Sequence, residues 1–206
     1  MKRLFAMLAG LLVTAGAVAQ EIAPDTLVRN VSNDVLEIVR KDKDIQSGNT
    51  RKAVELADAK VLPHFNFAHM TKLAVGKDWR QANPAQQKIL IDEFRSLLVR
   101  TYSKALTEYR NQTIDFKPLK MQPADTDVIV RTLVNQPGSK PVQIDYNLEK
   151  TDQGWKVYDI IVGGISLVTN YRGSFAQEIS AGGIDGLIAT LRTKNKSGDV
   201  PVAQKQ

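Results

Sequence analysis

Apolar residues recur at every third or fourth position through the first part of the chain, which is the spacing of amphipathic helices. In the first such stretch, residues 26–42, the residues that share one face are Leu27, Val31, Val35 and Ile38, with Val28 and Val39 beside it. A second helix is predicted over residues 51–62 and ends at Pro63, which cannot continue the helical hydrogen bonding. A third, shorter helix is predicted from Asn66, a common N-cap residue, to about Gly76.

The strongest helical signal begins at Asn83-Pro84. Asn83 is an N-cap type, Pro84 takes the first helical position, and Gln86 has the spacing of a capping box. The apolar stripe behind this start consists of Leu90, Phe94, Leu97, Leu98, Thr101, Ala105 and Tyr109. A helix of this length must lay its stripe against a large apolar surface.

In the middle of the chain the apolar spacing changes to every second position, the period of β-strands. Strands are predicted over residues 113–119, 128–135, 142–150 and 155–162. The apolar positions of the third strand are Val142, Ile144, Tyr146 and Leu148. They alternate with polar residues, so the sheet has one apolar and one hydrated face. The connections are short and polar, so neighbouring strands are antiparallel.

After Gly163-Gly164 the helical spacing returns, over residues 166–180 and again over 184–193, with a break at the glycines between them. Helices, then an antiparallel meander of four to five strands, then helices again predict an α+β domain.

The chain begins with Lys2-Arg3, an apolar run from Leu4 to Val18, and the sequence Ala17-Val18-Ala19. This is the pattern of a cleavable signal peptide over residues 1–19, and the run is shorter than the roughly 20 residues of a membrane span. An uncleaved N-terminal helix is the alternative. We therefore expect an exported, soluble protein with one domain over residues 20–194 and a disordered polar tail over residues 195–206.

Composition narrows the function. The chain has no cysteine, which argues against a lipid anchor and against disulfide or thiolate chemistry. The formal net charge is +6, but acidic and basic residues are interspersed, as in residues 40–44. No basic block forms a nucleic-acid footprint, and export also argues against nucleic acid as a partner.

Sequence features of catalysis are sparse. The two histidines, His64 and His69, are five residues apart, which does not suit a metal pair on one helical face, so neither a metal nor a cofactor is expected. Residues 164–168 resemble a nucleophile elbow, but Val168 replaces the closing glycine and both histidines precede Ser166. Ser166 is therefore expected to cap a helix.

Asp159 is the one candidate catalytic residue, because it interrupts an apolar strand. If Lys150 pairs with Trp155 across the turn, Tyr146 lies opposite Asp159. A carboxylate in an apolar cavity has a raised pKa and can act as a general base. The alternative is a structural carboxylate that is satisfied by Tyr146 or Arg172.

The predicted elements also carry more apolar surface than a compact core requires. The long helix, the apolar face of the sheet and the C-terminal helix must converge. They either pack at full density or leave a cavity for an apolar ligand, and composition does not decide between these outcomes.

Several motifs resemble the MlaC (toluene-tolerance) family of periplasmic phospholipid-binding proteins. They are Phe65-Asn66-Phe67, the run from Met70 to Arg80, the run from Phe94 to Tyr102, Val157-Tyr158-Asp159-Ile160, the run from Gly164 to Arg172, and the run from Gly183 to Ile188. The motifs span nearly the whole chain after residue 19. Two positions depart from the family pattern: Asn66 replaces an Asp, which preserves the N-cap, and Gly163 replaces an acidic residue.

The resemblance implies a strongly bent antiparallel sheet packed with helices around an apolar cavity, NTF2-like in general character. It implies a monomeric, non-enzymatic periplasmic carrier of a diacyl phospholipid, which maintains outer-membrane lipid asymmetry. The implied partners are an outer-membrane lipoprotein–porin complex and an inner-membrane ABC transporter complex with an MCE-domain protein. The alternative is a periplasmic enzyme that acts on a small apolar substrate with Asp159 as general base.

For such a carrier, the acyl tails are expected to contact the apolar positions of elements that face one another. The predicted lining is Met70, Leu73, Leu97, Leu98, Thr101, Val130, Ile144, Tyr146, Val157, Ile161, Ile165, Leu167, Val168 and Tyr171. The predicted partner-binding residues are Lys72, Lys77 and Arg80.

Overall fold

The computed structural model describes residues 22–197. The predicted signal peptide and residues 198–206 of the predicted tail lie outside the described residues. The described residues form six α-helices: α1 (Pro24–Lys41), α2 (Lys43–Gln46), α3 (Thr50–Lys60), α4 (Phe67–Val75), α5 (Pro84–Thr107) and α6 (Arg172–Ser197). None of these helices combines the length and the apolar character that a membrane crossing requires.

The helix boundaries follow the capping signals. The Asn66 side-chain oxygen accepts a hydrogen bond from the His69 backbone N–H (3.0 Å), which starts α4. The predicted capping box of α5 is confirmed, since Asn83 Oδ1 accepts from the Gln86 N–H (2.9 Å) and Gln86 Oε1 accepts from the Asn83 N–H (3.0 Å). Helix α3 ends just before Pro63, which lies in a 3₁₀ turn, η1 (Leu62–His64).

Helix α1 buries a face slightly different from the predicted one. Its buried apolar residues are Val28, Val35 and Val39. Of the predicted face, Leu27, Val31 and Ile38 are only partly buried, at the margins of the core. The face differs because α1 packs on the sheet at its N-terminal end and on other helices at its C-terminal end.

The sheet contains β1 (Thr113–Phe116), β2 (Asp127–Asn135), β3 (Val142–Thr151), β4 (Gly154–Val162) and β5 (Ile165–Ser166). The strands follow one another in sequence order, and each neighbouring pair is antiparallel. The predicted α+β class and antiparallel meander are therefore confirmed. Strand β1 is shorter than predicted because Pro118 has no N–H for the ladder.

The prediction that a helix begins at residue 166 is wrong. Gly163 and Gly164 have positive φ angles (57° and 87°) and turn the chain back on itself. Ile165 and Ser166 then pair with the end of β4 as strand β5. A 3₁₀ turn, η3 (Thr169–Tyr171), follows, and α6 begins only at Arg172.

Helix α6 contains the predicted break, at Gly183 (φ 65°, ψ −166°). It continues beyond the predicted end of the domain, and the prediction of a disordered tail from residue 195 is wrong for the first residues of that segment. The Asn195 amide donates hydrogen bonds to the backbone oxygen (2.9 Å) and to Oε2 (2.8 Å) of Glu93 on α5. These bonds hold the last turns of α6 against the long helix.

Strands β3 and β4 pair through a β-bulge that shifts the predicted register. The turn has the predicted pairing, but beyond it Asn147 pairs with Asp159 and Tyr146 pairs with Ile160. Tyr158 is the additional residue on the bulged strand. The prediction that Tyr146 lies opposite Asp159 is therefore wrong, because sequence alternation carries no signal for a bulge.

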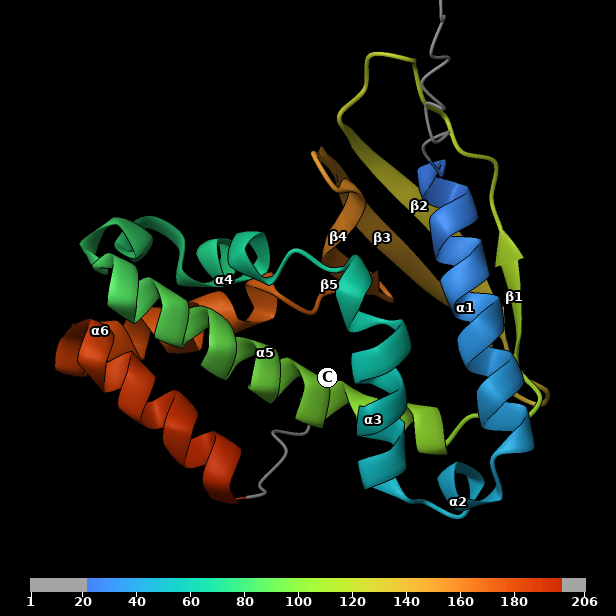
Figure 1. The fold of residues 1–206 in the computed structure, drawn as a ribbon, viewed down its shortest axis with the longest axis horizontal. Coiled ribbons are helices and arrows are strands. Elements are labelled where there is room, and N and C mark those ends of the chain that lie inside the picture. Colours follow the sequence, from blue (N-terminus) through green and yellow to red (C-terminus); the bar gives the residue numbers. More distant parts are fainter. Residues whose placement is uncertain (1–21, 198–206) are drawn as a thin grey trace, which may run out of the picture.

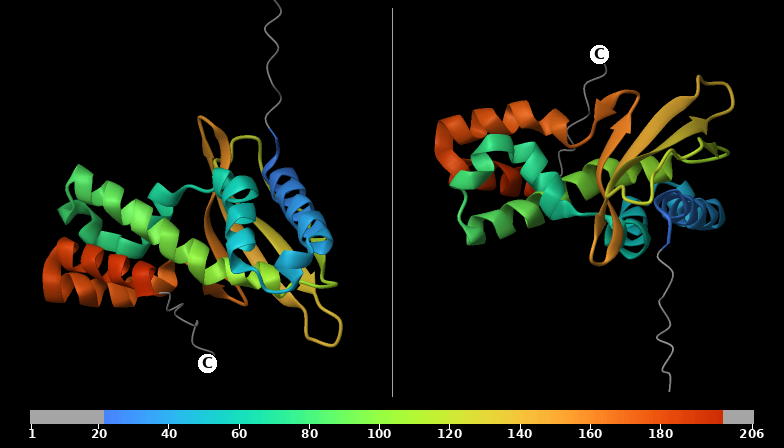
Figure 2. Two further views of the ribbon diagram at one scale, coloured as in Figure 1. Left: turned by 60° about the horizontal axis from the view of Figure 1, so that its bottom comes forward. Right: turned by 90° about the horizontal axis from the view of Figure 1, so that it is seen from above.

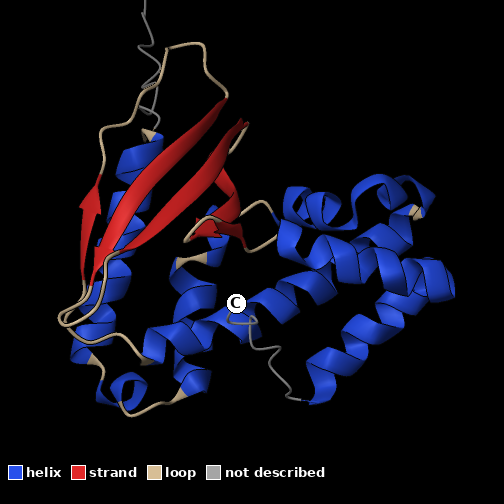
Figure 3. Cartoon of the chain, turned by 180° about the vertical axis from the view of Figure 1, so that it is seen from behind, coloured by secondary structure: helices blue, strands red, loops and turns tan. Residues whose placement is uncertain are grey.

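Helix α1 lies across one face of the sheet (Figure 1). Helices α4, α5 and α6 form a helical layer beside the sheet, and α3 lies between α1 and this layer. The same arrangement is visible when the molecule is turned about its horizontal axis (Figure 2). From behind, the long strands and the helical layer are also seen to stand side by side (Figure 3).

The buried apolar residues form three clusters. The helical cluster comprises Met70, Ala74, Val75, Ala82, Leu90, Phe94, Leu97, Leu98, Val168, Phe175, Ile179, Ile184, Leu187, Ile188 and Leu191. The sheet cluster comprises Val28, Val128, Val130, Leu148, Trp155 and Val157. The N-terminal cluster comprises Val35, Val39, Ile45, Leu56 and Tyr109. A domain of this size normally has one contiguous core, so the division between helical layer and sheet is a distinctive feature.

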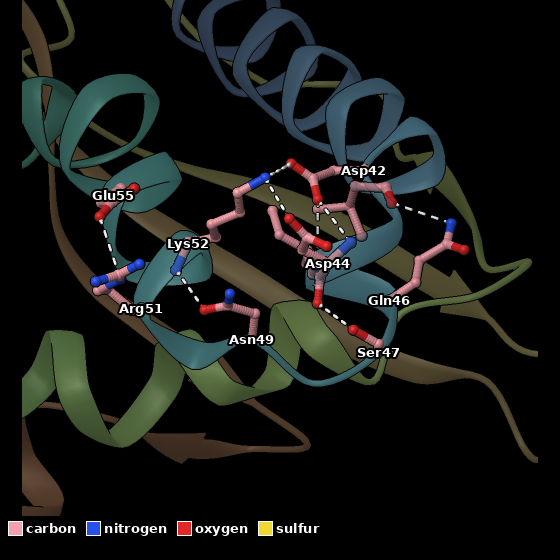
Figure 4. Close-up of polar contacts among 10 residues, drawn as sticks. Asp42, Asp44, Gln46, Ser47, Asn49, Arg51, Lys52 and Glu55 are labelled. Atoms are coloured by element: carbon pink, nitrogen blue, oxygen red, sulfur yellow. Dashed lines mark hydrogen bonds and ion pairs between the residues drawn. The ribbon is translucent and has the colours of Figure 1, made fainter.

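The corner between α1 and α3 is held by polar contacts (Figure 4). Asp42 caps α2, with its Oδ1 accepting from the Asp44 N–H (2.9 Å) and the Ile45 N–H (3.1 Å). The Lys52 ammonium lies 3.3 Å from Asp42 Oδ2 and 2.7 Å from Asp44 Oδ2. The chain itself thus supplies a positive charge between these two carboxylates.

Candidate functional site

The two faces of the sheet have different characters, and the strand register assigns each residue to a face. One face, here called the apolar face, carries Val128, Val130, Thr132, Val134, Val142, Ile144, Tyr146, Leu148, Trp155, Val157, Ile160, Val162 and Ile165. The opposite face carries mainly polar residues, among them Arg131, Asp145, Asn147 and Asp159. Because of the bulge, Val157 shares the apolar face with Ile160, while Asp159 and Ile161 are directed to the other side.

Part of the apolar face is covered by α1. Val28 packs there in the sheet cluster, and Leu27 and Tyr146 pack against its margin. Burial raises the pKa of Tyr146, and hydrogen bonding with Thr132 and with Ser32 of α1 opposes that rise. Tyr146 therefore lies at the margin of the region covered by α1, with its hydroxyl near polar partners.

The rest of the apolar face is progressively more open. Ile144 and Val162 are half-buried, whereas Val142 is 43% and Ile165 58% exposed. The register places these four residues next to one another, since Ile144 pairs with Val162 and Val162 pairs with Ile165. We call them the open strip. An open apolar strip that continues from a buried core is typical of a surface that binds an apolar ligand.

The structure does not bring the predicted lining residues together in one place. Met70, Leu97, Leu98 and Val168 are buried in the helical cluster, with Leu73 and Tyr171 packed against it. Val130, Val157 and Tyr146 belong to the sheet cluster or its margin, and Ile144 and Ile165 belong to the open strip. Thr101, Ile161 and Leu167 are half-buried outside these sets.

The residues of the apolar face that are absent from the sequence-based set include Ile160 and Val162 of β4. The prediction places Ile161 on the apolar face because it takes the alternation of side chains to continue unbroken from Val157 through Asp159. The bulge at Tyr158 reverses the phase, so Ile160 and Val162 take that face instead. No residue pattern in the strand signals this reversal.

Hydroxyl groups gather where α5 meets the turn η3. Burial raises the pKa of Tyr171, and its hydroxyl lies near those of Thr101 and Tyr102. Burial also raises the pKa of Tyr102. The Thr101 hydroxyl is buried without a partner in good hydrogen-bond geometry, although it adjoins Tyr171. The structure thus brings Thr101 and Tyr171, two of the predicted residues, together.

Asp159 has neither of the partners expected from the sequence. Its Oδ2 accepts a hydrogen bond from Ser166 Oγ (2.6 Å) and its Oδ1 accepts from the Val168 N–H (3.3 Å). Ser166 Oγ in turn accepts from the Thr169 N–H (2.9 Å), so Ser166 caps the η3 turn and not a long helix. Arg172 instead donates to the backbone oxygen of Leu73 (2.9 and 3.1 Å).

The histidine His69 is engaged with a residue other than Asp159. It lies on α4, where its Nδ1 is 2.8 Å from Glu149 Oε1 of β3 and its ring stacks on Tyr158 of β4 with 4.4 Å between the ring centroids. Among residues 22–197, no group of three potential metal ligands is present. Asp159 is therefore satisfied as a structural carboxylate, in agreement with the structural alternative.

A separate groove of about 380 Å³ lies at the N-terminus of α4 and the β3–β4 turn. Its walls include Phe65, Phe67 and Lys156, and Lys156 Nζ donates to the Pro63 backbone oxygen (2.7 Å). No predicted lining residue borders this groove. The predicted partner-binding residues Lys72, Lys77 and Arg80 are all exposed, on α4 and the 3₁₀ segment η2 (Gly76–Gln81).

These features define an α+β domain in which helices cover only part of the apolar face of an antiparallel sheet. Comparison with known families gives the assignment. The family model described as MlaC protein matches residues 29–193, and the chain belongs to this family. The resemblance inferred from the motifs is confirmed.

Individual relatives agree with this assignment. A solved structure of a phospholipid-binding protein from Ralstonia solanacearum in complex with a phospholipid is 42% identical, with a TM-score of 0.79 over 84% of this chain and 97% of that one. The intermembrane phospholipid transport system binding protein MlaC of Haemophilus influenzae is 24% identical over 90% of this chain and 88% of its own length. Toluene tolerance protein ttg2D of Pseudomonas putida is 28% identical over 79% of this chain and 75% of its own length. These relatives are named as binding, transport and tolerance proteins, in agreement with the prediction of a non-enzymatic protein.

Proposed function

We propose that this protein is a periplasmic carrier of phospholipid, exported by its signal peptide and active as a binding protein between the two membranes. The observation that carries the proposal is the phospholipid held by the Ralstonia solanacearum protein, which shares 42% identity and the fold over 84% of this chain. The open strip supports it from this chain's own residues, because it offers aliphatic side chains in continuity with the sheet cluster.

The acyl tails of a diacyl phospholipid would lie against the part of the apolar face that α1 leaves uncovered, from its margin at Tyr146 along the open strip. The contacts proposed here are Tyr146, Ile144, Ile160, Val162 and Ile165. Of these, Ile160 and Val162 take the place of Ile161 in the sequence-based set. Burying one methylene gains about 0.8 kcal/mol, so a tail of ordinary length cannot leave this surface for water at a useful rate. The same tail is equally dry in a bilayer, so transfer between protein and membrane is close to balanced.

Exchange at each membrane would then depend on docking with a partner that offers a dry route. We propose an outer-membrane lipoprotein–porin complex and an inner-membrane ABC transporter complex with an MCE-domain protein as the two partners. Lys72, Lys77 and Arg80 remain the proposed docking residues, supported by their exposure on α4 and η2. Such a cycle would preserve the lipid asymmetry of the outer membrane.

Lipid extraction tests the proposal. Protein purified from the periplasm without detergent should yield close to one diacyl phospholipid per chain by phosphorus assay and mass spectrometry of the extract. A folded protein that yields only trace phospholipid, and takes none up from vesicles, would contradict the proposal. Conversion of a small apolar substrate that requires Asp159 would favour the enzyme alternative instead.

A further inference from the structure

The segment of residues 163–171, here called the crossover segment, joins the two regions of the molecule. It leaves β4 at the Gly163-Gly164 turn and enters α6 at Arg172. Its residue Ile165 belongs to the open strip, and Val168 is fully buried in the helical cluster. Residues three positions apart thus belong to the candidate lipid site and to the main core.

The crossover segment has little regular structure to hold it. Strand β5 has two residues, and outside it the backbone is held by hydrogen bonds from Gly163 N–H to the Gln143 oxygen (2.9 Å), from Leu167 N–H to the Ile160 oxygen (2.8 Å) and from Tyr171 N–H to the Val168 oxygen (3.1 Å). Further side-chain contacts come from Asp159, which is 4% exposed. Its carboxylate accepts from Ser166 Oγ at 2.6 Å and from the Val168 N–H at 3.3 Å.

The β-bulge explains how a carboxylate reaches this position. If the strand alternated regularly through Tyr158, Asp159 would lie on the apolar face, two positions after Val157. The bulge turns it to the opposite face, where it meets the backbone of the crossover segment. The same shift places Ile160 on the apolar face. The bulge thus removes the Asp159 carboxylate from that face and directs it to the crossover segment on the opposite side.

Burial of this carboxylate has a cost that the local contacts oppose. Burial raises the pKa of Asp159, and the hydrogen bonds from Ser166 and from the Val168 N–H lower it. A carboxylate on the surface would avoid this cost. We therefore attribute the buried position of Asp159 to its hydrogen bonds with the crossover segment, which also fix the position of Ile165.

We propose that Asp159 is a positioning residue of the lipid site: through Ser166 and Val168 it keeps the crossover segment against β4, so that Ile165 stays on the open strip and a bound tail is retained. This inference rests on the proposed function. It assigns Asp159 a role in the rate of lipid exchange, with no part in chemistry.

The test measures the rate at which loaded protein loses a fluorescent phospholipid to acceptor vesicles of phosphatidylethanolamine and phosphatidylglycerol. Ser166→Ala removes one hydrogen bond to the carboxylate, and Asp159→Ala removes both. Each should accelerate lipid loss on the order of tenfold, the change expected when a hydrogen bond to a charged group no longer holds the closed segment. Asp159→Asn keeps an oxygen for the Val168 N–H and an amide near Ser166, so its rate should lie within about threefold of wild type.

Val39→Ala is the matched control, because it lowers stability in the N-terminal cluster without touching the crossover segment. It should keep the wild-type rate, and equal acceleration by this variant would overturn the proposal in favour of a general loss of stability. A wild-type rate of lipid loss in folded Ser166→Ala would also overturn the proposal. If Asp159→Ala fails to fold, the Ser166→Ala variant alone provides the test. A wild-type protein that cannot be loaded at all would instead contradict the proposed function.

Discussion

The helical layer and the sheet differ in how completely they bury their apolar residues. In the helical cluster, Phe94 is fully buried, and its ring packs edge-on against Tyr171 and Phe175 at 5.2 Å in each case. On the sheet, the same chain leaves Val142 and Ile165 roughly half exposed. The contrast indicates that the helical layer provides most of the stability, while the sheet keeps apolar surface available for a ligand.

The largest effect on stability should follow from a cavity in the helical cluster. Phe94→Ala should lower the free energy of unfolding by about 3–5 kcal/mol, because it removes a fully buried ring from a packed core. Urea unfolding followed by circular dichroism measures this change. For Ile160→Ala, at a half-buried position of the sheet, a loss of about 1 kcal/mol in the free energy of unfolding is expected. A smaller loss for Phe94→Ala than for Ile160→Ala would contradict the contrast between helical layer and sheet.

The opposite result is expected on the open strip. Ile144→Lys should leave the unfolding free energy within about 1 kcal/mol of wild type, because a half-buried lysine can extend its ammonium to water. It should nevertheless reduce bound phospholipid to a small fraction, since a charge would face the acyl tails. Bound lipid per folded chain is measured after extraction. Gln143→Lys, on the opposite face of the same strand, should retain full occupancy, and equal loss in both variants would remove the distinction between the faces.

A smaller effect is expected at the contact between α4 and the sheet. Glu149 Oε1 accepts from Asn66 Nδ2 (2.8 Å) and pairs with His69 Nδ1 (2.8 Å) at a partly buried position. Glu149→Ala should therefore cost about 1–2 kcal/mol, which chemical denaturation can measure, with no change in lipid occupancy. Asp92→Ala, which breaks an exposed pair with Lys88, is the control and should change stability by less than about 0.5 kcal/mol.

The smallest effect is a pH dependence that separates Asp159 from its neutral analogue. The pKa of Asp159 in the folded protein is raised above 3.8 by burial, so this group favours the folded state most at low pH, and the contribution is lost as the pH rises through the folded pKa. Asp159→Asn has no such titration. Relative to wild type, the Asn variant should therefore gain stability between about pH 4 and pH 7. A difference that stays constant or falls with pH would contradict the direction of the shift.

The sequence predicts the helical layer well because its signals are local. The Asn66 cap, the Asn83–Gln86 capping box and the break at Gly183 each depend on a few adjacent residues, and each is present in the structure. Burial within this layer follows from the same periodicity, as for Leu90 and Phe94.

The site is less predictable because it depends on long-range pairing. A single bulge at Tyr158 changes which residues share a face, and two glycines convert an expected helix start at Ser166 into strand β5. The partners of Asp159 come from seven and nine positions further along the chain, across that turn. Residue types and the order of the motifs are therefore sufficient to predict the family, but they are not sufficient to predict which residues line the site.

Native mass spectrometry of the mature protein, purified without detergent, tests the central claim most directly. The wild-type spectrum should be dominated by the chain plus the mass of one or more diacyl phospholipids, and Phe94→Ala molecules that remain folded should carry the same lipid. Ile144→Lys should appear mainly as the bare chain. Bare wild-type protein that stays bare after incubation with phospholipid vesicles, or full lipid occupancy in Ile144→Lys, would contradict the account of the sheet as the lipid-binding surface.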